Sequence, residues 1–341
     1  MLYFASDYQE GCCPEILEKL GEINLAHHIG YGKDSLCEKA RQTIRKVCDC
    51  PDVPVHFLTG GTQANSTVIS ALLRQYQGVL AAETGHIAGH EAGAVEYTGH
   101  KVLCLPPVQG KVSAASVCSY MKAFLANDTN DHMVEPGMVY ISHPTECGTL
   151  YTREELTELH KVCRSYHLPL FLDGARLGYG LAAPGTDVTL EDVASLTDAF
   201  TIGGTKVGAL FGEAVVFPTP SLGDHFFTIT KEHGALLAKG WLLGLQFEVL
   251  FTDNLYLRIA KHADDMAMLL KKGLAQKGYA FHPETFTNQQ FPVMDDATLN
   301  ELSRRVVYSM WEPLQGGKSV IRLATSWATT EAEVQELLAS L

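Results

Sequence analysis

Short, almost continuously apolar runs recur through the first two thirds of this chain, and segments with a helical apolar pattern separate them. Seven such runs are Val55–Thr59, Val79–Ala82, Val102–Leu105, Met138–Ser142, Leu168–Asp173, Ala199–Gly203 and Ala214–Phe217. Strands that are apolar on both faces are typical of a parallel sheet buried between helices. The alternation therefore predicts an α/β domain in which helices cover a mainly parallel sheet.

Two of the intervening segments carry clear helix signals. Asn65–Gln75 has apolar residues at helical spacing, and Thr152–Tyr166 opens with Thr152 followed three residues later by Glu155. Thr and Glu at this spacing form a capping box, in which each side chain bonds the other residue's backbone amide. We expect both segments to be helices.

The pattern changes after about Leu250. Arg258–Lys277 predicts one long helix, and Phe291–Met294, Val306–Leu314 and Ser319–Thr325 predict strands. A second capping box at Thr330 predicts a terminal helix. A length of 341 residues allows about two domains at ~150 residues each. We therefore predict an N-terminal arm (1–15), a large domain (16–250) and a small α+β domain (251–341).

Composition argues against several classes of partner. Lys and Arg number 26 against 39 Asp and Glu, a net charge of −13, which disfavours nucleic acid and anionic membrane surfaces. No apolar stretch reaches the ~18–20 residues of a membrane span, and the first residues lack a secretory signal. The nine cysteines have no zinc-site spacing. We expect a cytoplasmic enzyme with reduced thiols and no bound metal.

Charged residues follow two of the predicted strands directly. Asp173 ends the run Leu168–Asp173, and Lys206 follows Ala199–Gly203, 206 − 173 = 33 residues later. The carboxyl ends of parallel strands meet at one edge of a sheet, where α/β proteins bind ligands. Pyridoxal phosphate (PLP) requires a Lys that forms a Schiff base and an acid that keeps its ring nitrogen protonated. Alternatively, Asp173 pairs with Arg176 or caps a helix, and Lys206 is a surface lysine in a glycine turn.

Three further features fit a PLP site when taken in order along the chain. The glycine loop Thr59–Asn65 lies between a strand and a helix, as a phosphate cradle or as a plain tight turn. It has neither the dinucleotide nor the Walker A spacing. His86 follows a strand and is able to stack on a planar ring or to make a structural hydrogen bond. Arg322 lies inside a predicted strand, where its guanidinium either binds a carboxylate through two hydrogen bonds or points into solvent.

This ordered set resembles the fold-type I PLP enzymes, and more narrowly the threonine aldolase branch of the aromatic amino acid β-eliminating lyase family. The resemblance runs from Ser6-Asp7 to Arg322, and its most specific part is the pentapeptide Asp173–Leu177. Thr59–Asn65 and the run Gly203–Val216 around Lys206 support it. The resemblance implies a large, mainly parallel sheet domain and a small C-terminal α+β domain. It also implies retro-aldol cleavage of L-threonine, L-allo-threonine or a related β-hydroxy-α-amino acid to glycine and an aldehyde.

The resemblance implies a role for each candidate residue toward the cofactor. Lys206 would form the Schiff base, Asp173 would pair with the pyridine nitrogen, and His86 would stack on the ring. Lys206, Asp173 and His86 are thus the candidate catalytic residues. The remaining cofactor contacts are Arg176 on the phenolic oxygen side of the ring, and Gly61 and Thr62 at the phosphate.

The substrate side of the site is implied in the same way. Arg322 would bind the substrate carboxylate with Ser6 nearby. Tyr31, with Asp34, matches a family segment that reaches a neighbouring subunit's site. Members are homodimers or homotetramers with active sites shared between subunits, so the same is expected here.

The chain also departs from the family pattern. Many members carry a second active-site histidine that contacts the substrate's β-hydroxyl, and here Thr145 or Glu146 stands at that place. The acceptor of the hydroxyl proton is therefore open, with His86 or a water held near Glu146 as candidates. Lys239 occupies the segment that bears a phosphate-binding arginine in relatives.

Three other functions remain as alternatives. A PLP-dependent β-eliminating lyase or racemase would use the same cofactor on another bond. A non-catalytic PLP-binding protein would have no use for Arg322. A nicotinamide-dependent dehydrogenase would need the dinucleotide fingerprint that the chain lacks.

Overall fold

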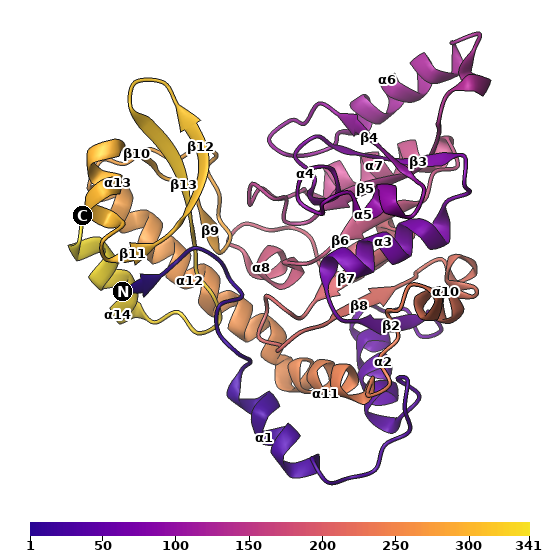
Figure 1. The fold of residues 1–341 in the computed structure, drawn as a ribbon, viewed down its shortest axis with the longest axis horizontal. Coiled ribbons are helices and arrows are strands. Elements are labelled where there is room, and N and C mark those ends of the chain that lie inside the picture. Colours follow the sequence, from indigo (N-terminus) through magenta and orange to yellow (C-terminus); the bar gives the residue numbers. More distant parts are fainter.

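The computed structural model describes residues 1–341 and has a seven-stranded sheet at its centre (Figure 1). Its strands are β2 (Val55–Leu58), β3 (Gln77–Ala82), β4 (Lys101–Leu105), β5 (Glu135–Ser142), β6 (Leu170–Asp173), β7 (Ala199–Gly203) and β8 (Glu213–Val216). Their order across the sheet is β2-β8-β7-β6-β5-β3-β4, and only β8 runs antiparallel to its neighbours. The seven predicted strands and the mainly parallel α/β fold are confirmed.

Helices pack on both faces of this sheet and join its strands. They are α2 (Ser35–Val47), α3 (Gly61–Leu72), α4 (His86–Gly89), α5 (Ala94–Tyr97), α6 (Ala114–Leu125), α7 (Arg153–Ser165), α8 (Leu177–Ala182), α9 (Leu190–Leu196), α10 (Phe226–Glu232) and α11 (Trp241–Leu250). Short 3-10 turns lie at Asn130–His132 (η1), Pro220–Gly223 (η2) and Thr252–Asn254 (η3). The predicted helices over Asn65–Gln75 and Thr152–Tyr166 correspond to α3 and α7, and the Thr152–Glu155 capping box is present.

Strand β6 shows why the apolar runs are continuous. Leu170 and Leu172 belong to one buried apolar cluster of 46 residues, whereas Phe171 between them belongs to a second cluster of 18. Successive strand residues point to opposite faces, so both faces of the sheet are buried under helices. Burial of both faces stabilises the sheet and leaves its strand ends as the accessible edge.

The C-terminal part forms a smaller lobe, drawn in orange and yellow in Figure 1. Its elements are α12 (Leu255–Gln276), β9 (Gln289–Gln290), β10 (Val293–Asp295), α13 (Asp296–Leu302), β11 (Val306–Val307), β12 (Ser309–Leu314), β13 (Lys318–Ala324) and α14 (Glu331–Ala339). Strand β13 pairs antiparallel with β9, β10 and β12. The predicted strand Phe291–Met294 is interrupted, since Pro292, which has no N–H to donate, lies between β9 and β10. Helix α13 was not predicted.

The N-terminal segment bridges the two lobes. Strand β1 (Leu2–Tyr3) pairs in parallel with β11, and the Phe4 carbonyl accepts a hydrogen bond from the backbone of Ala324. The chain then crosses to the large lobe, where Cys13 donates to the Gly208 carbonyl and α1 (Pro14–Ile23) begins. Residues 4–13 therefore span the opening between the two sheets. None of the helices has the combination of length and apolar character that a membrane crossing requires.

Candidate active site

Loops at the carboxyl ends of β3, β5, β6 and β7 surround one cavity of about 40 Å³. Its lining includes His86, Glu146, Asp173, Arg176 and Lys206, together with Gly61, Asn65, Ser142, Pro144 and Ala175. A larger cavity of about 480 Å³ shares His86, Glu146, Arg176 and Lys206 and adds Tyr8, His90, Ser309, Met310, Trp311 and Arg322. The two cavities adjoin, since they share these four residues, and they lie where the small lobe faces the strand ends of the large one.

Asp173 is a buried carboxylate held by three hydrogen bonds. Its Oδ2 accepts from Asn65 Nδ2 at 2.8 Å and from the Tyr140 hydroxyl at 2.6 Å, and its Oδ1 accepts from the Ala175 amide at 2.8 Å. Burial and the neighbouring Asp173 charge raise the pKa of Tyr140 well above its usual value, so the hydroxyl stays a donor. One acceptor position of Oδ1 remains free for a donor in the cavity.

Lys206 lies in a glycine turn that follows β7. A side chain at Gly203 would collide with the backbone of Ala175, so the close approach of the β6 and β7 loops requires glycine there. Burial lowers the pKa of Lys206, and the charge of Arg176 lowers it further, whereas Asp7, Asp173 and Glu213 act in the opposite direction. A lowered pKa increases the fraction of neutral amine, which is the nucleophilic form.

Arg176 forms a two-point ion pair with the N-terminal segment. Its Nε and Nη2 donate to the two carboxylate oxygens of Asp7 at 2.7 and 2.9 Å, and Asn288 donates to Asp7 at 2.9 Å. Although burial alone raises the pKa of Asp7, the charge and hydrogen bonds of Arg176 outweigh it and lower the pKa to about 2. The pair fixes the guanidinium at the boundary of both cavities.

His86 begins the short helix α4 and is fixed through a chain of buried groups. Its Nδ1 lies 2.7 Å from Glu91 Oε1, which also accepts from Asn65 Nδ2 at 2.8 Å. Since Asn65 also bonds Asp173, the imidazole and that carboxylate are held by one amide. The arrangement orients the imidazole ring relative to Asp173 at the cavity wall.

Arg322 reaches the larger cavity from β13. It donates from Nη2 to the Ala5 carbonyl at 2.9 Å and to Ser309 Oγ at 3.3 Å, and from Nη1 to Gln289 Oε1 at 3.4 Å. Its Nε is buried and has no partner in the protein. All of its partners are neutral, so the charge of Arg322 is available to an anionic ligand.

The remaining predicted residues lie around these groups at different distances from the cavity. Gly61 lines the smaller cavity at the N-terminus of α3, and a side chain at Gly60 or Gly61 would meet only open space. Thr62 is exposed on the same turn. Ser6 is half-buried between Ala5 and Asp7, the two residues that contact Arg322 and Arg176.

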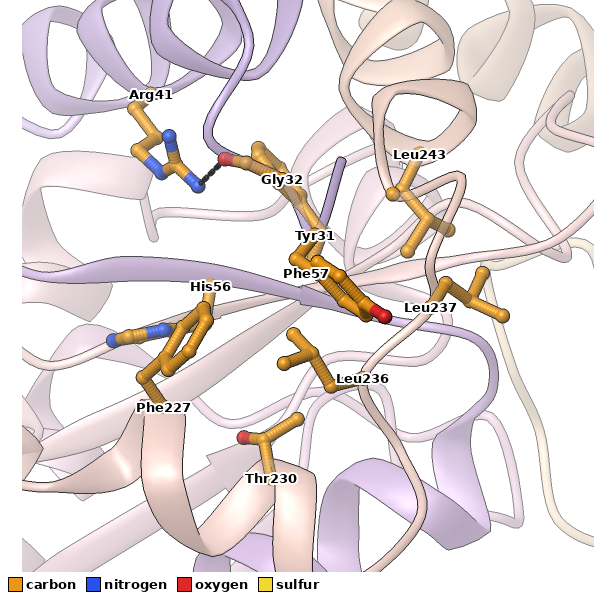
Figure 2. A pocket seen from close by; sticks show the side chains of 11 residues that line it. Tyr31, Gly32, Arg41, His56, Phe57, Phe227, Thr230, Leu236, Leu237 and Leu243 are labelled. Atoms are coloured by element: carbon orange, nitrogen blue, oxygen red, sulfur yellow. Dashed lines mark hydrogen bonds between the residues drawn. The ribbon is translucent and has the colours of Figure 1, made fainter. Parts of the chain in front are cut away.

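Tyr31 does not lie at this site within one chain. It lines a separate cavity of about 30 Å³ with Leu236, Leu237 and Leu243, next to the bond from Arg41 to the Gly32 carbonyl (Figure 2). Asp34 caps α2 by accepting from the Cys37 amide at 2.9 Å. Lys239 is exposed.

Sequence reasoning did not identify several groups that the site uses. The sequence places Asn65 at the end of the glycine loop and the start of a helix but indicates no chemical role for it, nor for Asp7, Glu91 or Tyr140. Glu213 begins β8 beside the Lys206 turn, where it accepts from Thr205 Oγ1 at 3.0 Å and has a buried, unpartnered second oxygen. Burial raises the pKa of Glu213 to about 8. The one feature of the sequence that could have drawn attention to Glu213 is its position directly before the predicted strand Ala214–Phe217.

Comparisons with known proteins agree with this geometry. A family model described as beta-eliminating lyase matches residues 3–297. A low specificity L-threonine aldolase from a Pseudomonas strain is 32% identical over 99% of this chain and 96% of its own length. A solved threonine aldolase structure from Leishmania major is 43% identical, covers 99% of this chain and 98% of its own, and has a TM-score of 0.96. An aspartate aminotransferase from Thermus thermophilus, 14% identical with a TM-score of 0.73, shares the fold.

Proposed function

From the premise that the chain belongs to the beta-eliminating lyase family, we propose that it uses PLP to cleave L-threonine, L-allo-threonine or a related β-hydroxy-α-amino acid into glycine and an aldehyde. One observation carries the proposal: Asp173 and Lys206 line the same cavity, and Lys206 also lines the adjoining larger cavity together with Arg322. The threonine aldolases among its relatives point to the same substrate class.

The residues present fit PLP. Asp173 has a free acceptor position for a ring N–H, and Lys206 offers an amine with a lowered pKa. The open N-terminus of α3 at Gly60–Gly61 presents backbone amides and the positive end of the helix dipole to a phosphate. When bound, the cofactor supplies an electron sink for the pair released from a bond to Cα.

Arg322 determines which bond is presented for cleavage. Its guanidinium holds the amino acid's carboxylate, and this fixes the rotation about the bond between the substrate nitrogen and Cα. Asp173 contributes a negative charge that stabilises a protonated ring nitrogen, while His86 bounds the site. The roles of Gly61, Thr62, Ser6 and Arg176 at the cofactor and substrate remain those expected from the sequence.

We infer that Tyr31 acts on the site of a neighbouring subunit in a homodimer or homotetramer. Its separation from Lys206 in one chain and its partial exposure, 43%, support this. Sedimentation of the purified protein would give the number of subunits. An inactive Lys206→Ala protein mixed with an inactive Tyr31→Phe protein should regain activity if sites are shared.

The substrate assay separates the proposed reaction from its alternatives. Purified protein with PLP is given L-threonine, L-allo-threonine, phenylserine or serine, and aldehyde, glycine, ammonia, keto acid and D-isomer are measured. We expect aldehyde and glycine in equal amounts, with no product from Lys206→Ala and normal turnover from Lys122→Ala, a control at an exposed lysine on α6. Ammonia and keto acid would instead indicate β-elimination. Formation of the substrate's D-isomer would indicate racemisation.

A further inference from the structure

Glu146 occupies a position that no step above uses. It lies in the loop after β5, and it is the only carboxylate that lines both the cavity of Asp173 and Lys206 and the cavity of Arg322. A substrate whose carboxylate is held by Arg322 and whose amine is directed to Lys206 must place its remaining substituents near this junction. The β-carbon and its hydroxyl are such substituents.

The two oxygens of Glu146 have different surroundings. Its Oε1 accepts from Ser142 Oγ at 2.6 Å and from the His86 amide at 2.8 Å, and these bonds fix the carboxyl plane. Its Oε2 has no hydrogen bond and is not among the fully enclosed atoms. One oxygen therefore anchors the group, while the other is free to accept a proton.

We propose that Glu146 Oε2 takes the proton from the substrate's β-hydroxyl during cleavage, an inference that rests on the proposed function. The hydroxyl proton moves to Oε2, and the oxygen's electron pair forms the carbonyl bond of the departing aldehyde. The Cα–Cβ bond breaks, and its pair stays with the glycine fragment. Glu146 then releases its proton to solvent as the aldehyde leaves, and solvent supplies one proton to Cα, which completes glycine.

The electrostatic surroundings suit this task. Burial raises the pKa of Glu146, and a base whose pKa is nearer to neutrality is more effective. The charged or titratable groups that face it across the cavities are Lys206, Arg176, Arg322, Asp173, His86, His90 and Tyr8. The charge of Asp173 also raises this pKa, whereas the hydrogen bonds from Ser142 and the His86 amide lower it and favour the ionised carboxylate that the step requires.

Two nearby histidines are the alternative bases. His86 uses its Nδ1 on Glu91 at 2.7 Å. His90 is exposed, and its ring centre lies 5.9 Å from that of His86 without a hydrogen bond to hold it. His86 lines both cavities as Glu146 does and keeps Nε2 without a partner, so it is the competing base from which the Glu146→Gln variant distinguishes the proposal.

Glu146→Gln is the test, because an amide oxygen retains both anchoring hydrogen bonds while the basic group is lost. Two reactions of the PLP-saturated protein are compared: threonine cleavage, and exchange of a glycine α-proton in D2O, which involves no β-hydroxyl. Cleavage should fall ~10²–10⁴-fold, the usual value of a general base, and glycine exchange should remain within about threefold. Glu154→Gln, the same change at an exposed position on α7, should alter neither reaction.

Two additional readouts separate catalysis from positioning. Threonine binding, followed by the change in cofactor absorbance, should be unaffected in Glu146→Gln. The wild type's kcat/KM should fall as the pH drops through the pKa of Glu146, and this limb should be absent from the variant. Equal loss of cleavage and glycine exchange, or an unchanged acid limb, would overturn the proposal. If the wild type exchanges glycine but cleaves no β-hydroxy amino acid, the proposed function itself fails.

Discussion

The ion pair between Asp7 and Arg176 should contribute strongly to stability, and Asp7→Asn tests it. The substitution preserves shape but removes the negative charge beside a guanidinium whose side chain is only 12% exposed. Removing one partner of a buried pair costs about 3–5 kcal/mol, because the other charge stays buried without compensation. We expect a loss of that size in the free energy of unfolding of the cofactor-free protein at pH 7.

The pKa of Asp7 gives the part of this stabilisation that depends on pH. Lowering that pKa from 3.8 to about 2 corresponds to about 2 kcal/mol. A carboxyl with a lowered pKa stabilises the fold above its ordinary value and loses this contribution as the pH falls toward about 2. The gap between wild type and variant should therefore be constant from pH 5 to 8 and should narrow below about pH 4.

Urea unfolding followed by circular dichroism provides the measurement, with Arg176→Met and the double variant completing a cycle. Each single variant leaves a buried charge unpaired and the double variant leaves none, so the double variant should lose less than the sum of the two. Additive losses, or a loss below about 1 kcal/mol in Asp7→Asn, would refute the buried-pair interpretation.

Three other changes have defined outcomes. Arg322→Gln removes a charge-assisted hydrogen bond worth about 1.5–3 kcal/mol, so KM for threonine should rise ~10–100-fold, while cofactor binding should change less. An unchanged KM would mean that another group binds the substrate's carboxylate. Asp173→Asn should lower kcat by a similar factor while cofactor absorbance persists, whereas wild-type turnover would contradict its contact with the ring. Because burial raises the pKa of Glu213 from 4.5 to about 8, the wild type should lose stability as the pH rises through this range. In thermal unfolding of the cofactor-free protein, the Glu213→Gln variant should not show this loss of stability at higher pH. If the stability of wild type and variant changed with pH in the same way, a buried, protonated Glu213 would be excluded.

The sequence predicted the central sheet well because burial on both faces leaves a strong, local signal. Every strand from β2 to β8 is marked by an apolar run, and capping boxes at Thr152 and Thr330 marked the starts of α7 and α14. The small lobe was predicted less well. Strand β9 is the buried polar pair Gln289–Gln290, and α13 is a seven-residue helix, so neither has enough apolar periodicity to be recognised.

Part of the candidate site could be predicted because two of its charged residues directly follow predicted strands in the sequence. Asp173 and Lys206 each follow a strand directly, so their meeting at one edge was predictable. Asp7 and Arg176 are 169 positions apart, and Asn65 and Asp173 are 108 apart. No local pattern encodes such pairs, since the first depends on how the N-terminal segment crosses between the lobes and the second on how α3 packs beside the end of β6. Burial, which sets the pKa of Glu146 and Glu213, likewise arises only in the folded chain.

The role of Lys206 as the covalent anchor is tested most directly by borohydride reduction of the PLP-treated protein, followed by peptide mass spectrometry. Reduction should remove the Schiff-base absorbance band, which lies within roughly 300–500 nm, and should attach the reduced cofactor to the peptide that contains Lys206. Addition of threonine before reduction should decrease this labelling, since the substrate's amine competes for the cofactor. A protein that stays colourless with PLP, or carries the label on another lysine, would contradict the assignment of the site.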